Sequence, residues 1–361
     1  MRLLQNIGLY RNYRARHRAI IAGQPDFAGQ MRAFLGDRYA SAHILQPNLQ
    51  GDPDAFLAIG DDPHTQLQWA VENGLKRSAT LEDILLAQLE AHRAEVFYNM
   101  EPVPYGDPFL KRLPSCVKRT IAWRAAPSPH HNFFNHDLVV SNFPGILRGY
   151  AEQGARTAPF QPAHDPEFDI QARRIDRPID ILFVGGYTQY HRQRAELLQR
   201  VAQLGRSYNV VFHLDESRKV RLAETPLGLV GPLAGLRRPP EIRAIARPSV
   251  FGRALHKALG SAKIVLNGAI DMAGPERGNI RCFEALGAGC LMVSDEGLYP
   301  AGFEAGRNFV AYRTAEEAVD VLTEALDHWD ESAGIAKAGH RMIAAEYSKA
   351  RQWAAFQALA S

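Results

Sequence analysis

Short runs of β-forming residues alternate with helical stretches along most of this chain, and that alternation limits the fold more than any other feature. The runs are residues 2–7, 95–99, 119–124 and 137–141 in the first half, and residues 179–186, 209–214, 263–267, 290–294 and 308–312 in the second. Strands that alternate with helices form parallel sheets whose faces the helices cover. We therefore predict an α/β protein with two doubly wound sheets.

A proline-rich stretch separates the two series of strands. Residues 159–178 hold four prolines, several charges and no clear periodicity, which is typical of a domain junction. We accordingly predict an N-terminal domain at residues 1–168 and a C-terminal domain at residues 169–345. The remaining residues, 346–361, carry apolar side chains at helical spacing and are predicted to form a helix that packs back toward the N-terminal domain.

Composition excludes several classes of protein. The three cysteines have no zinc-like spacing, which indicates a reduced, cytoplasmic protein without disulfides or a bound metal ion. A net charge of +3 is too small to argue for a nucleic-acid partner. The start of the chain lacks the apolar run of a signal peptide, and no stretch approaches the roughly 20 apolar residues of a membrane span.

Membrane contact would therefore be peripheral, at the inner face of the membrane. A basic cluster near the N-terminus offers one surface for it: Arg11, Arg14, Arg16 and Arg18. These side chains could contact an anionic acceptor or lipid headgroups, or they could form a solvated helix face.

The most informative passage is residues 274–295. Pro275 suits the first position of a helix, and Ile280, Phe283 and Leu286 give that helix one apolar face. Two glycines then end the helix before the strand expected at residues 290–294. Such a helix points its N-terminus at the C-terminal edge of a parallel sheet, where ligands bind in open α/β folds.

The polar residues of this passage suit a sugar nucleotide. Backbone N–H groups around Gly278 and Asn279, at the positive end of the helix dipole, can hold a phosphate. Glu284 can accept hydrogen bonds from a ribose diol, and Glu276 can hold sugar hydroxyls. The alternative is that Glu284 only pairs with Arg281 or a neighbouring arginine on a solvated helix face.

The spacing of Glu276 and Glu284 resembles the Glu-x7-Glu region of family-four glycosyltransferases. The sequence Arg-Cys-Phe-Glu-Ala, from Arg281 onward, resembles the core of the C-terminal domain of group-one glycosyltransferases, including the CgeB-like branch. This resemblance implies the GT-B architecture, in which two Rossmann-like domains face a cleft and the C-terminal domain holds the donor. It implies that Glu284 binds the donor ribose, that Glu276 lies near the donor sugar, and that Arg281 belongs to the donor site.

The resemblance also implies an activity. We expect a glycosyltransferase that moves a sugar from a nucleotide-diphosphate sugar to a glycan, lipid-linked saccharide, protein or small molecule, in a setting such as cell-envelope polysaccharide biosynthesis. GT-B enzymes stabilise the leaving diphosphate with helix N-termini and cationic side chains, so we expect no cofactor and no required metal ion. The Glu-x7-Glu spacing favours retention of anomeric configuration. Two alternatives share the architecture: a nucleotide-sugar 2-epimerase and a non-catalytic nucleotide-sugar-binding protein.

Other candidates follow predicted strands. Gly185 and Gly186 would let the backbone approach a diphosphate, which Arg192 or Arg194 would neutralise; a tight turn before a solvated basic helix is the alternative. In the first domain, the catalytic candidates are His130 and Glu101, which an inverting enzyme would need as a base. Both lie in proline-rich loops that could equally be rigid surface segments.

Overall fold

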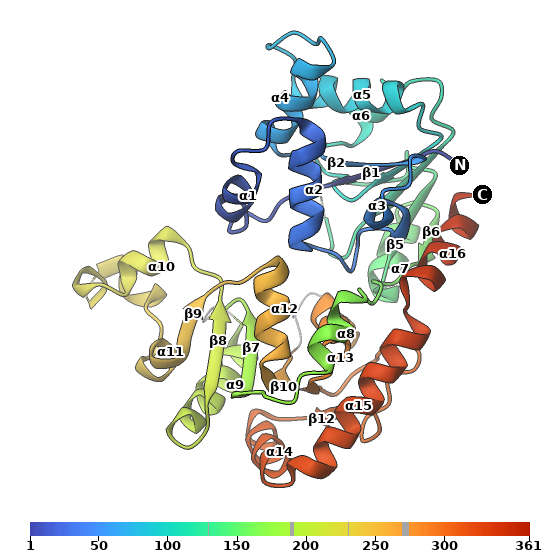
Figure 1. Ribbon diagram of the computed structural model, residues 1–361. Coiled ribbons are helices and arrows are strands. Elements are labelled where there is room, and N and C mark those ends of the chain that lie inside the picture. The colour runs from blue at the N-terminus through green and yellow to red at the C-terminus, as the bar shows by residue number, and fades with distance from the viewer. Residues whose placement is uncertain (129, 188–190, 230, 269–273) are drawn as a thin grey trace. The chain divides into compact units, whose positions relative to one another are not determined.

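The computed structural model describes residues 1–128, 130–187, 191–229, 231–268 and 274–361, and these form two compact units (Figure 1). The first unit contains residues 1–163, 274–276 and 349–361. The second contains residues 164–268 and 277–348. Each unit has its own parallel sheet and its own apolar core.

The first unit is built on six parallel strands in the order β2-β1-β3-β4-β5-β6. Its strands are β1 (Leu3–Ile7), β2 (Ala55–Ile59), β3 (Val96–Asn99), β4 (Arg119–Trp123), β5 (Leu138–Ser141) and β6 (Thr157–Pro159). Its helices are α1 (Arg14–Ile21), α2 (Phe27–Asp37), α3 (Gln46–Gln50), α4 (Pro63–Glu72), α5 (Leu81–His92), α6 (Asp107–Leu110), α7 (Pro144–Glu152) and α16 (Lys349–Ala360). The last helix joins this core because Phe356 is fully buried, with its ring 4.9 Å from that of Tyr98.

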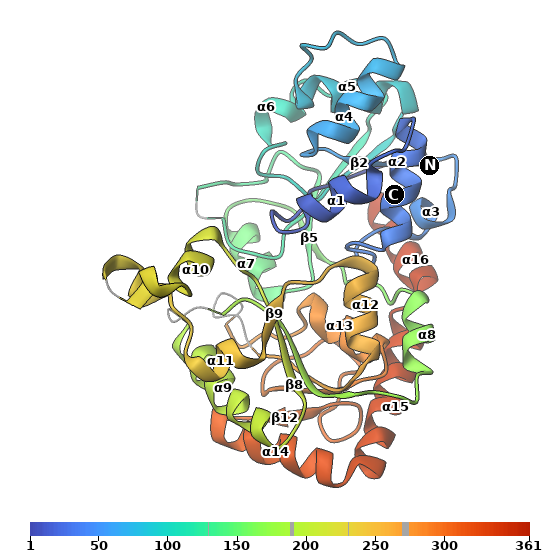
Figure 2. The same cartoon turned by 60° about the vertical axis from the view of Figure 1, so that its left-hand side comes forward.

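The second unit has six parallel strands in the order β12-β11-β10-β7-β8-β9 (Figure 2). Its strands are β7 (Ile179–Gly185), β8 (Val210–Leu214), β9 (Ala246–Pro248), β10 (Ala262–Leu266), β11 (Leu291–Asp295) and β12 (Val310–Tyr312). Its α-helices are α8 (Glu167–Ala172), α9 (Arg192–Gln203), α10 (Arg218–Ala223), α11 (Pro240–Ile245), α12 (Gly252–Gly260), α13 (Ile280–Gly287), α14 (Ala315–Asp327) and α15 (Trp329–Glu346). Three 3₁₀ turns complete it: η1 (Leu204–Arg206), η2 (Pro226–Leu229) and η3 (Gly231–Leu236).

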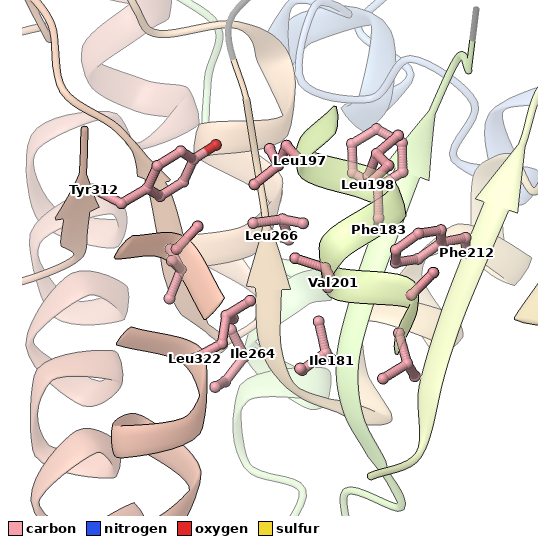
Figure 3. Packing of buried hydrophobic residues seen from close by; sticks show 14 of the residues in the cluster. Ile181, Phe183, Leu197, Leu198, Val201, Phe212, Ile264, Leu266, Tyr312 and Leu322 are labelled. Atoms are coloured by element: carbon pink, nitrogen blue, oxygen red, sulfur yellow. The ribbon is translucent and has the colours of Figure 1, made fainter. Parts of the chain in front are cut away.

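The strands of the second sheet read as nearly continuous apolar runs because helices cover both of their faces. On one face, Ile181, Phe212 and Ile264 pack against Leu198 and Val201 of α9 (Figure 3). A separate cluster, which includes Phe283 and Leu286 of α13, fills the other face. This packing fixes α13 on the sheet and so fixes the residues that α13 carries.

The predicted fold class is confirmed, and every predicted run contains a strand. The sequence reading did not name β2, although its Ala-Phe-Leu-Ala-Ile run before Gly60 is a strand signal. It also missed β6 and β9, which are three residues long, contain proline and lie at sheet edges, where proline is tolerated.

Candidate functional site

Helix α13 begins at Ile280, with Asn279 as its N-cap residue. The Asn279 side chain accepts a hydrogen bond from the backbone N–H of Arg281 at 3.0 Å. The prediction that Pro275 starts this helix is wrong, because Gly278 has φ +115°, which no helical residue adopts. A Cβ at Gly278 would also lie 2.7 Å from the Pro300 ring.

The other end of α13 is as predicted. The helix ends at Gly287, and Gly289 has φ +69°, the left-handed conformation that glycine adopts without strain. The chain then enters β11, so the N-terminus of α13 lies at the C-terminal edge of the sheet.

Glu284 is buried on the first turns of α13, where it forms an ion pair with Arg281. Burial raises the pKa of the Glu284 carboxyl, and the adjacent guanidinium opposes that rise. The Nε atom of Arg281 is buried and has no hydrogen-bond partner among the described residues. The pairing with Arg281 is therefore present, and it leaves a buried donor beside the carboxylate that a ligand could use.

Two more arginines lie at the same edge. The Nε atom of Arg277 donates to Asp295 at 2.6 Å, and a terminal nitrogen of Arg194 donates to the carbonyl of Gly268, just after β10, at 3.0 Å. Arg192, by contrast, is the exposed first residue of α9. Residues 188–190 of the predicted loop between Gly186 and this helix lie outside the described residues.

Asn267 holds this edge together, and the sequence reading did not name it. It is buried directly after β10, and its amide nitrogen donates to the Ser294 hydroxyl of β11 at 3.0 Å. Its side-chain oxygen accepts from the Asn279 amide at 3.2 Å, and its carbonyl accepts from the Tyr312 hydroxyl of β12 at 2.8 Å. Through its side-chain amide and its backbone carbonyl, Asn267 thus links three strands to the N-cap of α13. The available signal was a polar residue directly after a buried strand.

The two predicted glycines lie at the end of β7 and have different surroundings. Gly185 is the last residue of the strand, and a Cβ there would lie 3.0 Å from the Phe183 ring. A Cβ at Gly186 would meet no atom of the described residues within 4 Å.

Glu276 belongs to the first unit rather than the second. Its buried carboxylate accepts from the backbone N–H of Gly145, at 2.6 and 2.8 Å, and lies 3.4 Å from Arg148. Gly145 is near the N-terminus of α7, where the helix dipole favours an anion. The two glutamates of the predicted pair therefore have separate surroundings, and the sugar-binding role of Glu276 stays a prediction.

At the C-terminal edge of the first sheet, Gly8, Asp61 and Glu101 follow the neighbouring strands β1, β2 and β3. Gly8 and Asp61 both lie near the Glu101 carboxylate. A Cβ on Gly8, after β1, would overlap the Glu101 carboxylate. Burial, and then the nearby Asp61 after β2, raise the pKa of Glu101 to about 7, against the opposing effects of Arg124 and Arg14. Glu101 is therefore divided between its acid and base forms near neutral pH, which suits proton transfer.

The remaining predicted residues contribute less to these edges. His130 is exposed. In the N-terminal basic cluster, Arg14 pairs with Asp61 and Arg16 pairs with Asp37. Among the described residues, no group of three His, Cys, Asp or Glu side chains is placed to hold a metal ion.

Residues 211–358, most of which lie in the second unit, match the sequence family described as glycosyl transferase-like. The chain therefore carries a glycosyl transferase-like domain. No curated protein sequence matches the chain.

Solved structures of low sequence identity share the two-domain GT-B fold of this chain over nearly its whole length. HepE of Anabaena, in complex with UDP and glucose, is 11% identical with a TM-score of 0.61, and the similarity covers 99% of each chain. A glycosyltransferase of Rickettsia africae is 8% identical with a TM-score of 0.56, over 99% of this chain and 97% of that one. Sucrose-phosphate synthase of Thermosynechococcus elongatus is 11% identical with a TM-score of 0.52, over 99% of this chain and 98% of that one.

Proposed function

We propose that this chain is a glycosyltransferase that binds a nucleotide-diphosphate sugar at the C-terminal edge of its second sheet and transfers the sugar to a hydroxyl-bearing acceptor. The observation that carries the proposal is the Glu284–Arg281 pair beside the N-cap of α13, with Arg277 and Arg194 at the same edge. A carboxylate, three guanidinium groups and a helix N-terminus match the ribose and the diphosphate of such a donor.

Each group has a separate task in this proposal. Glu284 accepts hydrogen bonds from the ribose hydroxyls. Arg194, Arg277 and the N-terminus of α13 bind the diphosphate and stabilise the negative charge that grows on it as the glycosidic bond breaks. We propose that these fixed positive groups make a metal ion unnecessary, so EDTA should leave the initial rate unchanged.

We further propose that the transfer retains the anomeric configuration, because the spacing of Glu276 and Glu284 resembles the Glu-x7-Glu region of family-four glycosyltransferases. Glu101, with its pKa raised to about 7, is the group of the first unit best suited to exchange a proton with the acceptor hydroxyl. Proton NMR of the first product decides the stereochemistry. An inverted product would overturn the retaining proposal and would make Glu101 the base that an inverting reaction needs.

UDP-glucose is the first donor to test, because HepE has been crystallised with UDP and glucose and shares the fold over nearly the whole chain. The experiment measures UDP released from UDP-glucose, and from a panel of other sugar nucleotides, with and without glycan, lipid-linked and small-molecule acceptors. Acceptor-dependent release supports the proposal. Tight donor binding without release under any condition would overturn transfer in favour of binding alone, and donor interconversion without acceptor would identify a 2-epimerase.

A further inference from the structure

A small lobe projects from the second unit between β8 and α11 (Figure 1). It comprises the described residues of 216–239, which form the helix α10 and the two 3₁₀ turns η2 and η3. The helix α10 and the turns η2 and η3 pack mainly against one another. In both overall views α10 lies away from the strands of its own unit (Figure 2).

The interior of the lobe is ionic. Arg238 is buried and forms salt bridges with Glu224 and, at 2.8 Å, with Glu216. Next to it, the Arg237 guanidinium donates to the carbonyls of Ala223 and Thr225 at 2.7 and 2.8 Å. The charges that hold the lobe together therefore lie inside it.

Two leucines of the lobe, a residue type that is ordinarily buried, are exposed on its surface. Leu222 of α10 is 44% exposed, and Leu229 of η2 is 64% exposed. A Cβ at Gly228 would overlap the carbonyl oxygen of Ala223, so the glycine lets η2 lie directly on the end of α10. The turns are thus closely fitted to each other while the leucines stay outside. The lobe thus buries a charged side chain and exposes two leucines, which is the reverse of the usual distribution and indicates a contact surface.

Cationic side chains of α10 border Leu222. Arg218, Lys219 and Arg221 are all exposed, and the lobe holds five cations against two carboxylates. Because residues three and four apart share a helix face, Arg218 lies on the same side of α10 as Arg221 and Leu222. Arg221 is 3.8 Å from Glu216, yet its side chain is 63% exposed.

We propose that this lobe docks the protein on an anionic lipid surface. Leu222 and Leu229 enter the interfacial layer, and Arg218, Lys219 and Arg221 meet the phosphates of the headgroups. The predicted N-terminal cluster is less suited, because Arg14 and Arg16 already pair with carboxylates of their own unit. No helix of the described residues is long and apolar enough to cross a membrane. This inference goes beyond sugar transfer and does not depend on it.

The test is flotation of the full chain with phosphatidylcholine vesicles, with or without phosphatidylglycerol. The wild-type chain should float with the anionic vesicles, bind neutral ones far less, and be released as salt rises. Leu229→Ser should weaken binding about tenfold, because it removes one leucine from the apolar layer. Its control is Ile170→Ser, at a site 60% exposed elsewhere in the same unit, which should change binding by less than about twofold.

A second pair of variants tests the charges. Reversing Arg218 and Lys219 to glutamate should weaken binding to anionic vesicles about tenfold or more, whereas reversing the exposed Arg206 and Lys257 should have little effect. Thermal unfolding confirms that each variant is folded. Failure of the wild-type chain to float with anionic vesicles would overturn the proposal and leave the lobe to a protein partner. Equal losses in the lobe variants and their controls would also overturn it.

Discussion

The C-terminal edges of the two sheets have the same parallel topology and opposite chemistry. At the second edge, Arg194, Arg277 and Arg281 gather around the N-terminus of α13, and the nearby carboxylates are paired with arginines. At the first edge, Glu101 lies near Asp61, and its pKa is raised to about 7. The same architecture thus presents fixed positive charge in one unit and an exchangeable proton in the other.

This difference leads us to propose separate roles for the two edges, donor binding at the second and proton exchange at the first. Parallel strands bring residues distant in sequence to one edge, but the residue after each strand decides what that edge binds. If the two edges are specialised in this way, substitutions at the first edge should lower kcat and substitutions at the second should weaken UDP binding.

The largest effect should come from the first edge. Glu101→Gln keeps the size of the side chain and removes its proton exchange, so kcat should fall about 10²- to 10⁴-fold while UDP affinity stays unchanged. Steady-state kinetics and calorimetry with UDP check this, with the exposed Glu152→Gln as control. A Glu101→Gln enzyme of normal kcat would remove the proton-transfer role from this edge.

Glu284→Ala should act on binding instead. Loss of a charged hydrogen-bond acceptor should weaken UDP binding about 10- to 100-fold, measured by calorimetry on a protein shown to be folded. The exposed Glu331→Ala on α15 is the control. Unchanged donor affinity in a folded Glu284→Ala protein would contradict the ribose assignment.

The two arginines in the first turn of α9, Arg192 and Arg194, should differ in their effect on UDP binding. Arg194→Ala should weaken UDP binding about tenfold, because this guanidinium reaches the end of β10 and can meet the diphosphate. Arg192→Ala should change it by less than about twofold. Equal effects of the two substitutions would mean that the position of Arg194 at the edge is not what binds the donor.

A substitution in the turn before α13 should change the stability of the folded protein. Gly278→Ala forces an alanine into φ +115° beside Pro300 and should destabilise the protein by about 1–3 kcal/mol, seen as a lower melting temperature. Gly334→Ala, at an open position inside α15, should instead stabilise it by about 0.5–1 kcal/mol. Similar melting temperatures for the two variants would show that the Gly278 conformation is not required.

The smallest effect is the pH dependence of folding. The folded pKa of Glu101 lies above its ordinary value, so its carboxyl favours the folded state at low pH, and that contribution is lost as pH rises toward 7. Glu101→Gln should therefore raise the melting temperature at pH 8 more than at pH 5. If Glu101 is also the base, kcat/KM of the wild-type enzyme should rise with pH to a plateau above about 7. An equal gain in melting temperature at both pH values would place the pKa of Glu101 in its ordinary range.

Local patterns were enough to predict the parallel α/β class and the strand that follows α13. They also placed Glu284 and Arg281 on a helix that precedes a buried strand, while the donor-binding roles of both residues stay predictions drawn from the family resemblance. They failed at Pro275, where the proline suggested a helix start but the left-handed Gly278 delays it.

The sequence by itself therefore determined the layers of this protein and the helix that carries its donor-site candidates, since apolar periodicity acts over a few residues. Only the tertiary structure decided that Asn267 joins β10, β11 and α13, and that burial and then Asp61 raise the pKa of Glu101. Only it showed that the α10 lobe buries Arg238 and exposes two leucines. Hydrogen bonding, burial and charge coupling depend on neighbours from distant segments, and the fold chooses those neighbours.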